Sequence, residues 1–213
     1  MKLNSNEAYE LLMKAKAKSD GGYIDHSLVV GEAASRIAQE LNLDADKAKT
    51  LGYIHDIGKR NSFPFDLHDI QGYEYLLSLG IDEEYANICL THSYLNNDIA
   101  CVAGGYIDPD SYKYEFRKEF IKNHEYSIYE KIINLCDLMC TNKFLTLEER
   151  LIDLITRKGA HKNTQYHVIE AEKLKKEIEQ ELGQSIYSLF PEIVNRIGKD
   201  TNSKILRRNK NEK

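Results

Sequence analysis

Residues 26–59 of the chain read HSLVVGEAASRIAQELNLDADKAKTLGYIHDIGK. In the first half, apolar residues recur at steps of three and four and define one buried helical face: Val30, Ala33, Ile37 and Leu41. Asp44 is a favoured N-cap residue for the helix that follows. In that helix Leu51 and His55 share a face, and Gly58 is well placed to end it. The stretch therefore predicts two consecutive amphipathic helices.

The remaining segments have helical rather than strand patterns. Apolar residues recur at helical spacing in nearly all of them, and no alternating pattern of useful length predicts a strand. Ser127, with Glu130 three residues later, is typical of a capping box at a helix start. The fold class predicted is therefore all-α. The helices expected outside 26–59 cover residues 3–16, 68–79, 82–95, 112–124, 128–140, 147–157, 164–182 and 185–197, with loops over 59–67 and 96–111.

The composition is that of an ordinary globular protein. The 213 residues are 42% hydrophobic and 30% charged, which is enough apolar material for a core without disulfides. The net charge of -5 and the pI near 5.8 provide no field that attracts nucleic acid, so a nucleic-acid partner is not expected. Residues 199–213 are an exception, a basic run interpreted as a solvated, flexible tail, with contact to a polyanion as the alternative.

The cysteines and the apolar runs indicate the compartment. The four cysteines include no Cys-x-x-Cys pair, and Cys136 and Cys140 are interpreted as small buried hydrophobes. No apolar run approaches the roughly twenty residues that span a bilayer. Residues 1–20 have neither a continuous apolar core nor a small-residue cleavage site, so no signal peptide is expected. The sequence predicts a reduced, cytoplasmic protein without a membrane partner.

Four polar side chains fall on faces that the patterns turn inward. His26 lies on the side of the apolar stripe of its helix, and His55 lies on the buried face of the next helix. Adjacent helical residues point about 100° apart, so His55 and Asp56 reach one point only near the helix end that Gly58 provides. Asp137 lies in an almost wholly apolar helix, where a carboxylate is costly unless paired or metal-bound. Two nitrogen and two oxygen ligands suit Mn, Fe, Ni, Co or Zn.

Each of these residues also has an ordinary structural explanation. A single inward histidine is more often a satisfied core residue than a ligand. Asp137 alone could pair with Lys131 or Lys143, and the dipeptide His55-Asp56 has little specificity by itself. Only the combination of the four residues points to a metal site.

Three segments occur in the order that one known family shows. They are His26-Ser27 at a helix start, the run Tyr53-Ile54-His55-Asp56-Ile57-Gly58-Lys59, and Lys131-Ile132-Ile133-Asn134-Leu135-Cys136-Asp137-Leu138-Met139. In these segments the chain resembles the HD superfamily of metal-dependent phosphohydrolases, over residues 23–141. The resemblance implies a helical bundle with a metal ion held by His26, His55, Asp56 and Asp137. We expect one domain over 1–198, with additional C-terminal helices over 147–198.

The resemblance extends to a second metal and to the phosphate. Many two-metal members have histidines between the His-Asp pair and the last Asp. His68 and His92 occupy such positions in this chain. Asp56 would then bridge two ions. The alternative is that His68 merely starts a helix and His92 points into substrate or solvent. The family places a lysine near the phosphate at the position of Lys59, and Arg60 is a weaker candidate for the same role. The ions considered are Fe, Mn, Co, Ni, Zn and Mg, one or two per chain.

The implied reaction is hydrolysis of a phosphate ester by a metal-activated water. The expected substrate is a small phosphorylated molecule, most simply a nucleotide, and three tyrosines near the 96–111 loop could stack on a base or be ordinary aromatics: Tyr106, Tyr112 and Tyr114. Two alternatives are a di-iron oxygenase on the same scaffold and a regulatory module that only senses a ligand. A homodimer is left open. Three further histidines lie in polar contexts and are predicted to be surface residues: His124, His161 and His167.

Overall fold

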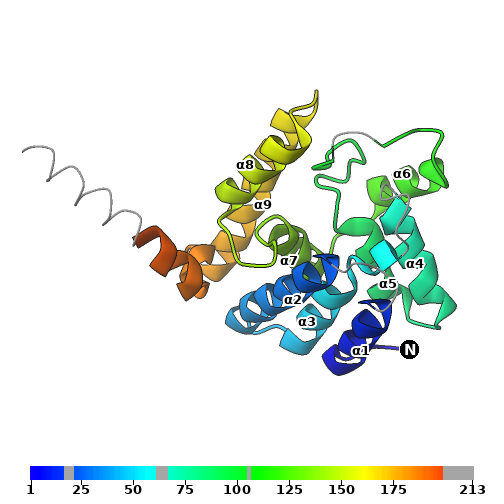
Figure 1. The fold of residues 1–213 in the computed structure, drawn as a ribbon, viewed down its shortest axis with the longest axis horizontal. Coiled ribbons are helices and arrows are strands. Elements are labelled where there is room, and N and C mark those ends of the chain that lie inside the picture. The colour runs from blue at the N-terminus through cyan, green and yellow to red at the C-terminus, as the bar shows by residue number, and fades with distance from the viewer. Residues whose placement is uncertain (17–21, 61–66, 105–106, 199–213) are drawn as a thin grey trace, which may run out of the picture.

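The computed structural model describes residues 1–16, 22–60, 67–104 and 107–198 (Figure 1). These residues form an all-α structure, as predicted, and β pairing among them is confined to two isolated bridges. In chain order the elements are α1 Ser5–Lys16, α2 Gly22–Glu40, α3 Ala45–Ile54, the 3-10 helix η1 Ile57–Arg60, α4 His68–Ser78, α5 Glu83–Thr91, α6 Tyr114–Asn123, α7 Ile128–Asp137, α8 Leu147–Lys158, α9 Thr164–Leu182, the 3-10 helix η3 Ile186–Leu189, and a helix over 191–198.

Two glycines allow α2 and α3 to pack backbone against backbone. A Cβ atom placed on Gly52 would lie 2.5 Å from the Cα of Gly31, and one placed on Gly31 would lie 2.5 Å from the ring of Tyr53. The predicted apolar stripe of α2 is buried, with Val30 and Ile37 fully inaccessible to solvent. This close approach brings α2 next to the end of α3.

A third glycine brings η1 against the start of α4. A Cβ atom on Gly58 would lie 1.9 Å from the carbonyl oxygen of His68, so no larger residue fits there unless α4 moves. The prediction that Gly58 ends the helix is wrong, because α3 ends at Ile54, His55 is its C-cap residue, and the chain continues into η1. His55 and Asp56 therefore lie at the junction of α3 and η1, with the start of α4 beside them.

Several other boundaries differ from the predicted ones, such as that of the helix expected over 82–95, which ends at Thr91. α2 begins at Gly22, so His26 lies one turn inside the helix rather than at its start. α7 ends at Asp137 instead of Cys140, so the carboxylate stands at a helix end. The predicted last helix is divided into η3 and a helix over 191–198 that begins with Pro191, a residue favoured at the first helical position.

The predicted helix caps are present. The side chain of Asp44 accepts a hydrogen bond from a backbone N–H in the first turn of α3, at 3.0 Å. Ser127 and Glu130 form the predicted capping box of α7. A second box, of Thr146 and Glu149, starts α8. Local hydrogen bonding thus sets these three helix starts.

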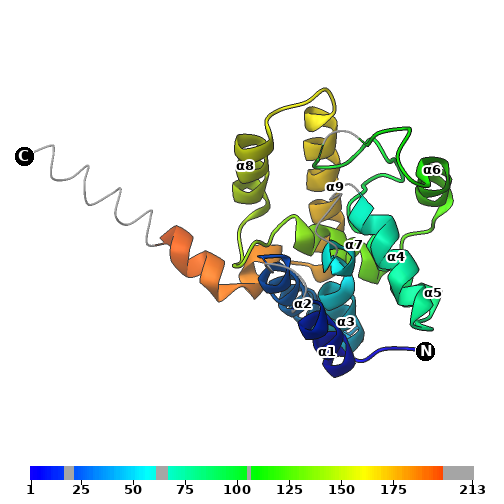
Figure 2. The same cartoon turned by 45° about the vertical axis from the view of Figure 1, so that its right-hand side comes forward.

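α8 and α9 form a hairpin beside the α1–α7 helices (Figures 1 and 2). Both views show the two helices side by side, with the segment after α5 opposite the N-terminal half of α9. The side chain of Asn163 donates to the carbonyl oxygen of Ala100 at 3.1 Å, and that of Asn96 donates to the hydroxyl of Tyr166 at 2.9 Å. Polar contacts therefore tie the hairpin to the 96–104 segment.

Candidate metal centre

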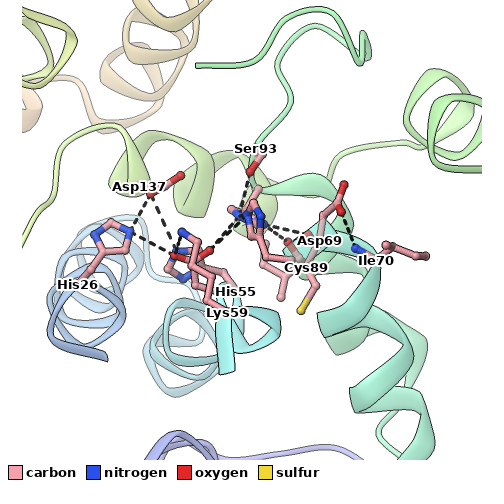
Figure 3. A network of polar contacts seen from close by, with 12 residues as sticks. His26, His55, Lys59, Asp69, Ile70, Cys89, Ser93 and Asp137 are labelled. Atoms are coloured by element: carbon pink, nitrogen blue, oxygen red, sulfur yellow. Dashed lines mark hydrogen bonds and ion pairs between the residues drawn. The ribbon is translucent and has the colours of Figure 1, made fainter. Parts of the chain in front are cut away.

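The four predicted ligands of the first metal come together although they belong to different helices (Figure 3). His26 is on α2, His55 and Asp56 follow α3, and Asp137 is the last residue of α7. Nε2 of His26 is 2.8 Å from Oδ1 of Asp137 and 3.9 Å from Oδ2 of Asp56. Nε2 of His55 is 3.5 Å from Oδ2 of Asp56 and 4.0 Å from Oδ1 of Asp137. Two nitrogens and two oxygens thus surround one point, a donor set that suits a divalent transition metal.

One ring nitrogen of His55 faces this point with its lone pair. Nδ1 is 2.7 Å from the carbonyl oxygen of Gly52, and because a carbonyl can only accept, Nδ1 carries the proton of that bond. Nε2 is buried and has no hydrogen-bond partner among the described residues. Burial lowers the pKa of His55 to about 3, against the opposing charge of Asp56, so the ring is neutral near pH 7. A buried lone pair beside two carboxylates fits a cation.

A second set of ligand atoms lies on the other side of Asp56. Its Oδ1 is 3.3 Å from Nε2 of His92 and 3.6 Å from Nε2 of His68, and these two nitrogens are 3.3 Å apart. Nδ1 of His92 lies 3.1 and 3.0 Å from the carbonyl oxygens of Ile88 and Cys89, where it donates. The two oxygens of Asp56 thus face different histidines, and one carboxylate could contribute a ligand atom on each side.

The carboxylates are ionised and the second-set histidine His68 is neutral. Burial alone would raise the pKa of Asp56, but nearby positive charge, above all that of Lys59, holds it well below its ordinary value. Burial also raises the pKa of Asp137, but the hydrogen bond to His26 and the charges of His26 and His55 together outweigh it, so the net pKa is lowered. Burial lowers the pKa of His68 to about 4. The centre therefore offers two negative charges, which a divalent cation would balance, and histidine lone pairs, to which it could bind.

The two predicted phosphate-binding residues have different surroundings. The ammonium of Lys59 forms an ion pair with Oδ2 of Asp56, and the side chain is 28% exposed, so part of it remains open to solvent. The guanidinium of Arg60 lies over the ring of Tyr75 on α4, 3.6 Å from the centroid, as in a cation–π contact. Neither contact tests phosphate binding, which stays a prediction for both residues.

Sequence reasoning missed two groups that hold the histidines. The hydroxyl oxygen of Ser93 lies 2.9 Å from Nε2 of His92. Burial lowers the pKa of His92, but the adjacent carboxylate of Asp56 outweighs this effect, so the net pKa is raised. The position of Ser93 directly after His92 was the only available signal. The carbonyl of Gly52 belongs to the backbone, and nothing in the sequence marks it.

The prediction that three histidines lie at the surface is wrong for at least two of them. His167 is only 5% exposed, because its side of α9 faces α8. His124 is partly buried, with its ring stacked on Phe120 and Nε2 2.7 Å from Glu130. His161 is also only partly exposed. Polar neighbours in the sequence were misleading, because burial depends on the face of a helix rather than on adjacent residues.

Two of the three tyrosines near the 96–111 loop lie in the described residues, and both make contacts with groups other than the candidate ligands. Tyr112 donates to Glu74 at 3.1 Å, and Tyr114 packs against a small apolar cluster of Tyr94, Ile99 and Ile121. Tyr106 and the basic run 199–213 lie outside the described residues. Lys131, an alternative partner of Asp137, instead pairs with Glu177 at 2.5 Å.

A comparison with known protein families matches the part of the chain that contains all the candidate ligands, from His26 to Asp137. The family model described as HD domain matches residues 23–142. Ribonuclease Y of Protochlamydia amoebophila is 39% identical over 80 residues, which are 36% of this chain and 15% of that protein. Ribonuclease Y of Ureaplasma parvum serovar 3 is 35% identical over 81 residues, 38% of this chain and 17% of that protein. Ribonuclease Y of Thermotoga petrophila is 36% identical over 89 residues, 40% of this chain and 18% of that protein.

The chain thus covers less than a fifth of the length of these relatives, from 15% to 18%. No solved structure gives a significant match. Among the described helices, none combines the length and the apolar character that a membrane span requires.

Proposed function

Because the chain belongs to the HD domain family, a superfamily of metal-dependent phosphohydrolases that bind divalent ions, we propose that it hydrolyses a phosphate ester of a nucleotide. The proposed ligands of the first ion are His26, His55, Asp56 and Asp137. The proposed ligands of a second ion are His68, His92 and the same Asp56. Bound divalent ions lower the pKa of water and polarise a phosphoryl oxygen.

The observation that carries this proposal is the placement of Asp56. Its Oδ2 faces His55 and its Oδ1 faces His68 and His92, all at 3.3 to 3.6 Å. Oδ1 is buried and accepts no hydrogen bond from the part of the chain that the structure describes. A buried carboxylate is costly in this state unless cations compensate it. One ion on each side of Asp56 would compensate its charge, and the two ions together could bind the oxygens of the reacting phosphate.

The chain's own groups would position the substrate and balance its charge. Lys59 stands beside Asp56 with part of its side chain open to solvent, where it can approach a nonbridging phosphoryl oxygen. Backbone carbonyls fix the orientation of the rings, that of Gly52 for His55 and those of Ile88 and Cys89 for His92. This rigid support is what a metal centre needs to hold its ligands in one geometry.

RNA is a second candidate substrate, because the relatives that match are named ribonucleases. An RNA phosphodiester and a nucleotide phosphate ester both react at a phosphorus atom whose nonbridging oxygens a divalent ion can polarise. The net charge of -5 favours the small substrate, since it provides no general attraction for a polyanion. Short RNA therefore belongs in the substrate test beside nucleotides.

The experiment that tests the function is metal analysis of the purified protein followed by a product-release screen. Mono-, di- and cyclic nucleotides and a short RNA oligonucleotide are incubated with Mn, Co, Fe or Mg. We expect release from one substrate class, lost in Asp56→Asn, a variant that keeps the size of the side chain but not its charge. Circular dichroism and thermal unfolding check that the variant is folded.

Three other outcomes would overturn the proposal. Bound metal with substrate-dependent oxygen consumption and no release of phosphate or RNA fragments would favour the di-iron oxygenase. Bound metal with tight nucleotide binding but no turnover under any metal would favour a sensing module. Release that persists fully in Asp56→Asn would show that the chemistry occurs elsewhere in the chain.

A further inference from the structure

A buried carboxylate adjoins the second set of candidate ligands. Asp69 directly follows His68 in the first turn of α4 and is 1% exposed. Its Oδ1 accepts a hydrogen bond from the backbone N–H of Ile70 at 2.6 Å, and its Oδ2 accepts one from the hydroxyl of Tyr94 at 2.6 Å. Nη1 of Arg117 lies 3.3 and 3.2 Å from the same two oxygens. Each oxygen thus has two donors, which uses the lone pairs of the carboxylate and leaves Asp69 unsuited to be a metal ligand itself.

Tyr94 connects this carboxylate to two other elements of the centre. It lies just beyond His92 at the end of α5, and it is 2% exposed. Its carbonyl oxygen accepts hydrogen bonds from Nδ2 of Asn134 at 3.2 Å and from the hydroxyl of Tyr126 at 3.1 Å. Asn134 lies on α7, one turn before Asp137. The backbone of Tyr94 is therefore held by α7 and its side chain by the start of α4.

The hydrogen bond between Tyr94 and Asp69 joins the two segments that carry His68 and His92. The Nε2 atoms of these histidines are 3.3 Å apart, although one histidine begins α4 and the other ends α5. Ligand atoms must be held at fixed positions to bind an ion tightly, and groups behind the ligands provide that support. Figure 3 shows Asp69 at the opposite end of the group from His26. The contact is thus placed to act on the second ion rather than on the first.

Arg117, on α6, balances the charge of Asp69. Its guanidinium is fully buried, and Nη2 donates to the hydroxyl of Ser111 at 2.5 Å. Compared with well-packed apolar side chains of similar volume, a buried ion pair often adds no stability. Its directional contacts nevertheless hold the carboxylate in one orientation, with Oδ2 toward Tyr94. The arrangement therefore favours a role in geometry beyond its role in packing.

We propose that Asp69, Tyr94 and Arg117 are positioning residues for the second metal site, which set the spacing of His68 and His92 without touching the ion. The inference rests on the proposed function for the presence of a second ion. Loss of the Tyr94 hydroxyl removes the direct connection between the two histidine segments and leaves every candidate ligand in place. Affinity for the second ion should then fall while affinity for the first is retained.

The test is a calorimetric titration of the chelator-treated full chain with Mn²⁺, for the wild type and for Tyr94→Phe. This substitution keeps the ring and the backbone contacts of Tyr94 and removes one hydroxyl. We expect the affinity for the second ion to fall by about tenfold, the lower end of the effect of groups that support metal ligands. The affinity for the first ion should be unchanged. In a His92→Ala background, from which the second ion is already lost, Tyr94→Phe should have no further effect on metal binding.

Tyr187→Phe is the matched control. The hydroxyl of Tyr187 also donates to a carboxylate, that of Glu148 at 2.7 Å, but it connects η3 with α8 and not the candidate ligands. Both Mn²⁺ affinities should stay at their wild-type values in this variant. If Tyr94→Phe does not fold, Ser111→Ala removes the partner of Arg117 and should weaken the second ion in the same selective way.

The outcomes separate this inference from the proposed function. Equal loss of both ions in Tyr94→Phe, the same loss in Tyr187→Phe, or wild-type affinities in Tyr94→Phe would each overturn the positioning role. A wild type that binds a single ion would also overturn it, because the spacing of His68 and His92 would then serve no ion. Two bound ions with selective loss of the second in Tyr94→Phe, but no hydrolysis of any substrate, would support the inference and refute the proposed function.

Discussion

Among the candidate metal ligands, His26 and Asp137 are the farthest apart in sequence and the closest in space. Asp137 follows His26 by 111 residues, yet its Oδ1 lies 2.8 Å from Nε2 of that ring. The hydrogen bond to His26 lowers the pKa of the carboxyl group although burial acts to raise it. The charge of Asp137 is therefore present at neutral pH, and as a ligand it would supply half of the negative charge of the first metal site.

Replacing Asp137 with Ala should abolish tight metal binding and activity. We expect metal affinity to fall by more than about 100-fold, because even the hydrogen-bond partners of metal ligands contribute about 10–100-fold. Helical content should be retained, since α7 keeps its capping box and its apolar face. Metal titration and circular dichroism check both parts, with Asp110→Ala in an exposed loop as the control. Full hydrolytic activity in the variant would mean that the ligand set is wrong.

His92→Ala should separate the two metal positions. The ring contacts Oδ1 of Asp56, whereas His26 and His55 face Oδ2, so its loss should remove the second ion and leave the first. We expect bound metal to fall from two per chain to one, with a larger loss in activity than in retention of the first ion. Elemental analysis beside a turnover assay measures both. Equal loss of both ions would show that the two positions are not independent.

Among the elements, α6 is held against α4 by a buried ion pair. Nη1 of Arg117 lies 3.3 and 3.2 Å from the two oxygens of Asp69, and Tyr94 donates to the same carboxylate at 2.6 Å. All three side chains are at most 2% exposed. Asp69 directly follows His68, so this contact also supports the start of α4 beside the centre.

Arg117→Met should destabilise the protein strongly, because it leaves the carboxylate of Asp69 buried without its counter-charge. We expect a loss of about 3–5 kcal/mol in the free energy of unfolding. Urea denaturation measures it, and Lys118→Met is the matched control, since Lys118 pairs with Glu115 only at the surface, at 3.4 Å. A change within about 0.5 kcal/mol, as for ordinary surface substitutions, would contradict the structural role given to Arg117.

An ion pair and a hydrogen bond to the same carboxylate connect α8 with α9 and η3. Lys175 donates to Glu148 at 2.6 Å and the hydroxyl of Tyr187 donates to the same carboxylate at 2.7 Å. Burial raises the pKa of Glu148, but these hydrogen bonds outweigh it and lower the pKa from 4.5 to about 2. Because the folded state binds the proton less readily than the unfolded state, the ionised carboxylate stabilises the fold.

This lowered pKa predicts how stability depends on pH. The contribution of Glu148 should be complete above pH 4.5 and should be lost as the pH falls toward 2. The difference in melting temperature between wild type and Glu148→Gln should therefore be larger at pH 7 than at pH 3. Thermal unfolding across this range measures it. A difference that is constant with pH would indicate that the packing of the side chain matters rather than its charge.

At the scale of the whole molecule, the centre is the place where side chains from five helical elements meet. The main apolar core runs from Leu3 to Ile193, and the candidate ligands come from α2, the end of α3, the start of α4, the end of α5 and the end of α7. An ion bound to such distant segments is absent from the unfolded chain, so binding it stabilises the fold by mass action.

Removal of metal should therefore lower the stability of the whole molecule. At an ion concentration 100 times the dissociation constant, the expected stabilisation is about 2.7 kcal/mol per site. Thermal unfolding with and without a chelator measures this effect, and Asp137→Ala should respond much less than the wild type. An identical melting temperature of the wild type with and without chelator would argue against a tightly bound ion.

The sequence by itself determined the features that depend on neighbours along the chain. Helical periodicity predicted the all-α class, and short-range hydrogen bonding predicted the caps at Asp44 and at Ser127 with Glu130. The motif around His55 and Asp56 predicted the family, which the match over residues 23–142 confirmed. These results follow from interactions within one or two helical turns, which the local sequence contains in full.

Only the tertiary structure decided which groups meet. The approach of Gly31 and Gly52 places α2 beside α3, and the contact of Gly58 with the start of α4 places His68 beside Asp56. The burial of His167 depends on how α9 turns toward α8, and polar neighbours in the sequence predicted the opposite. Distances between elements are set by side-chain volume and backbone approach across the core, which no local pattern encodes.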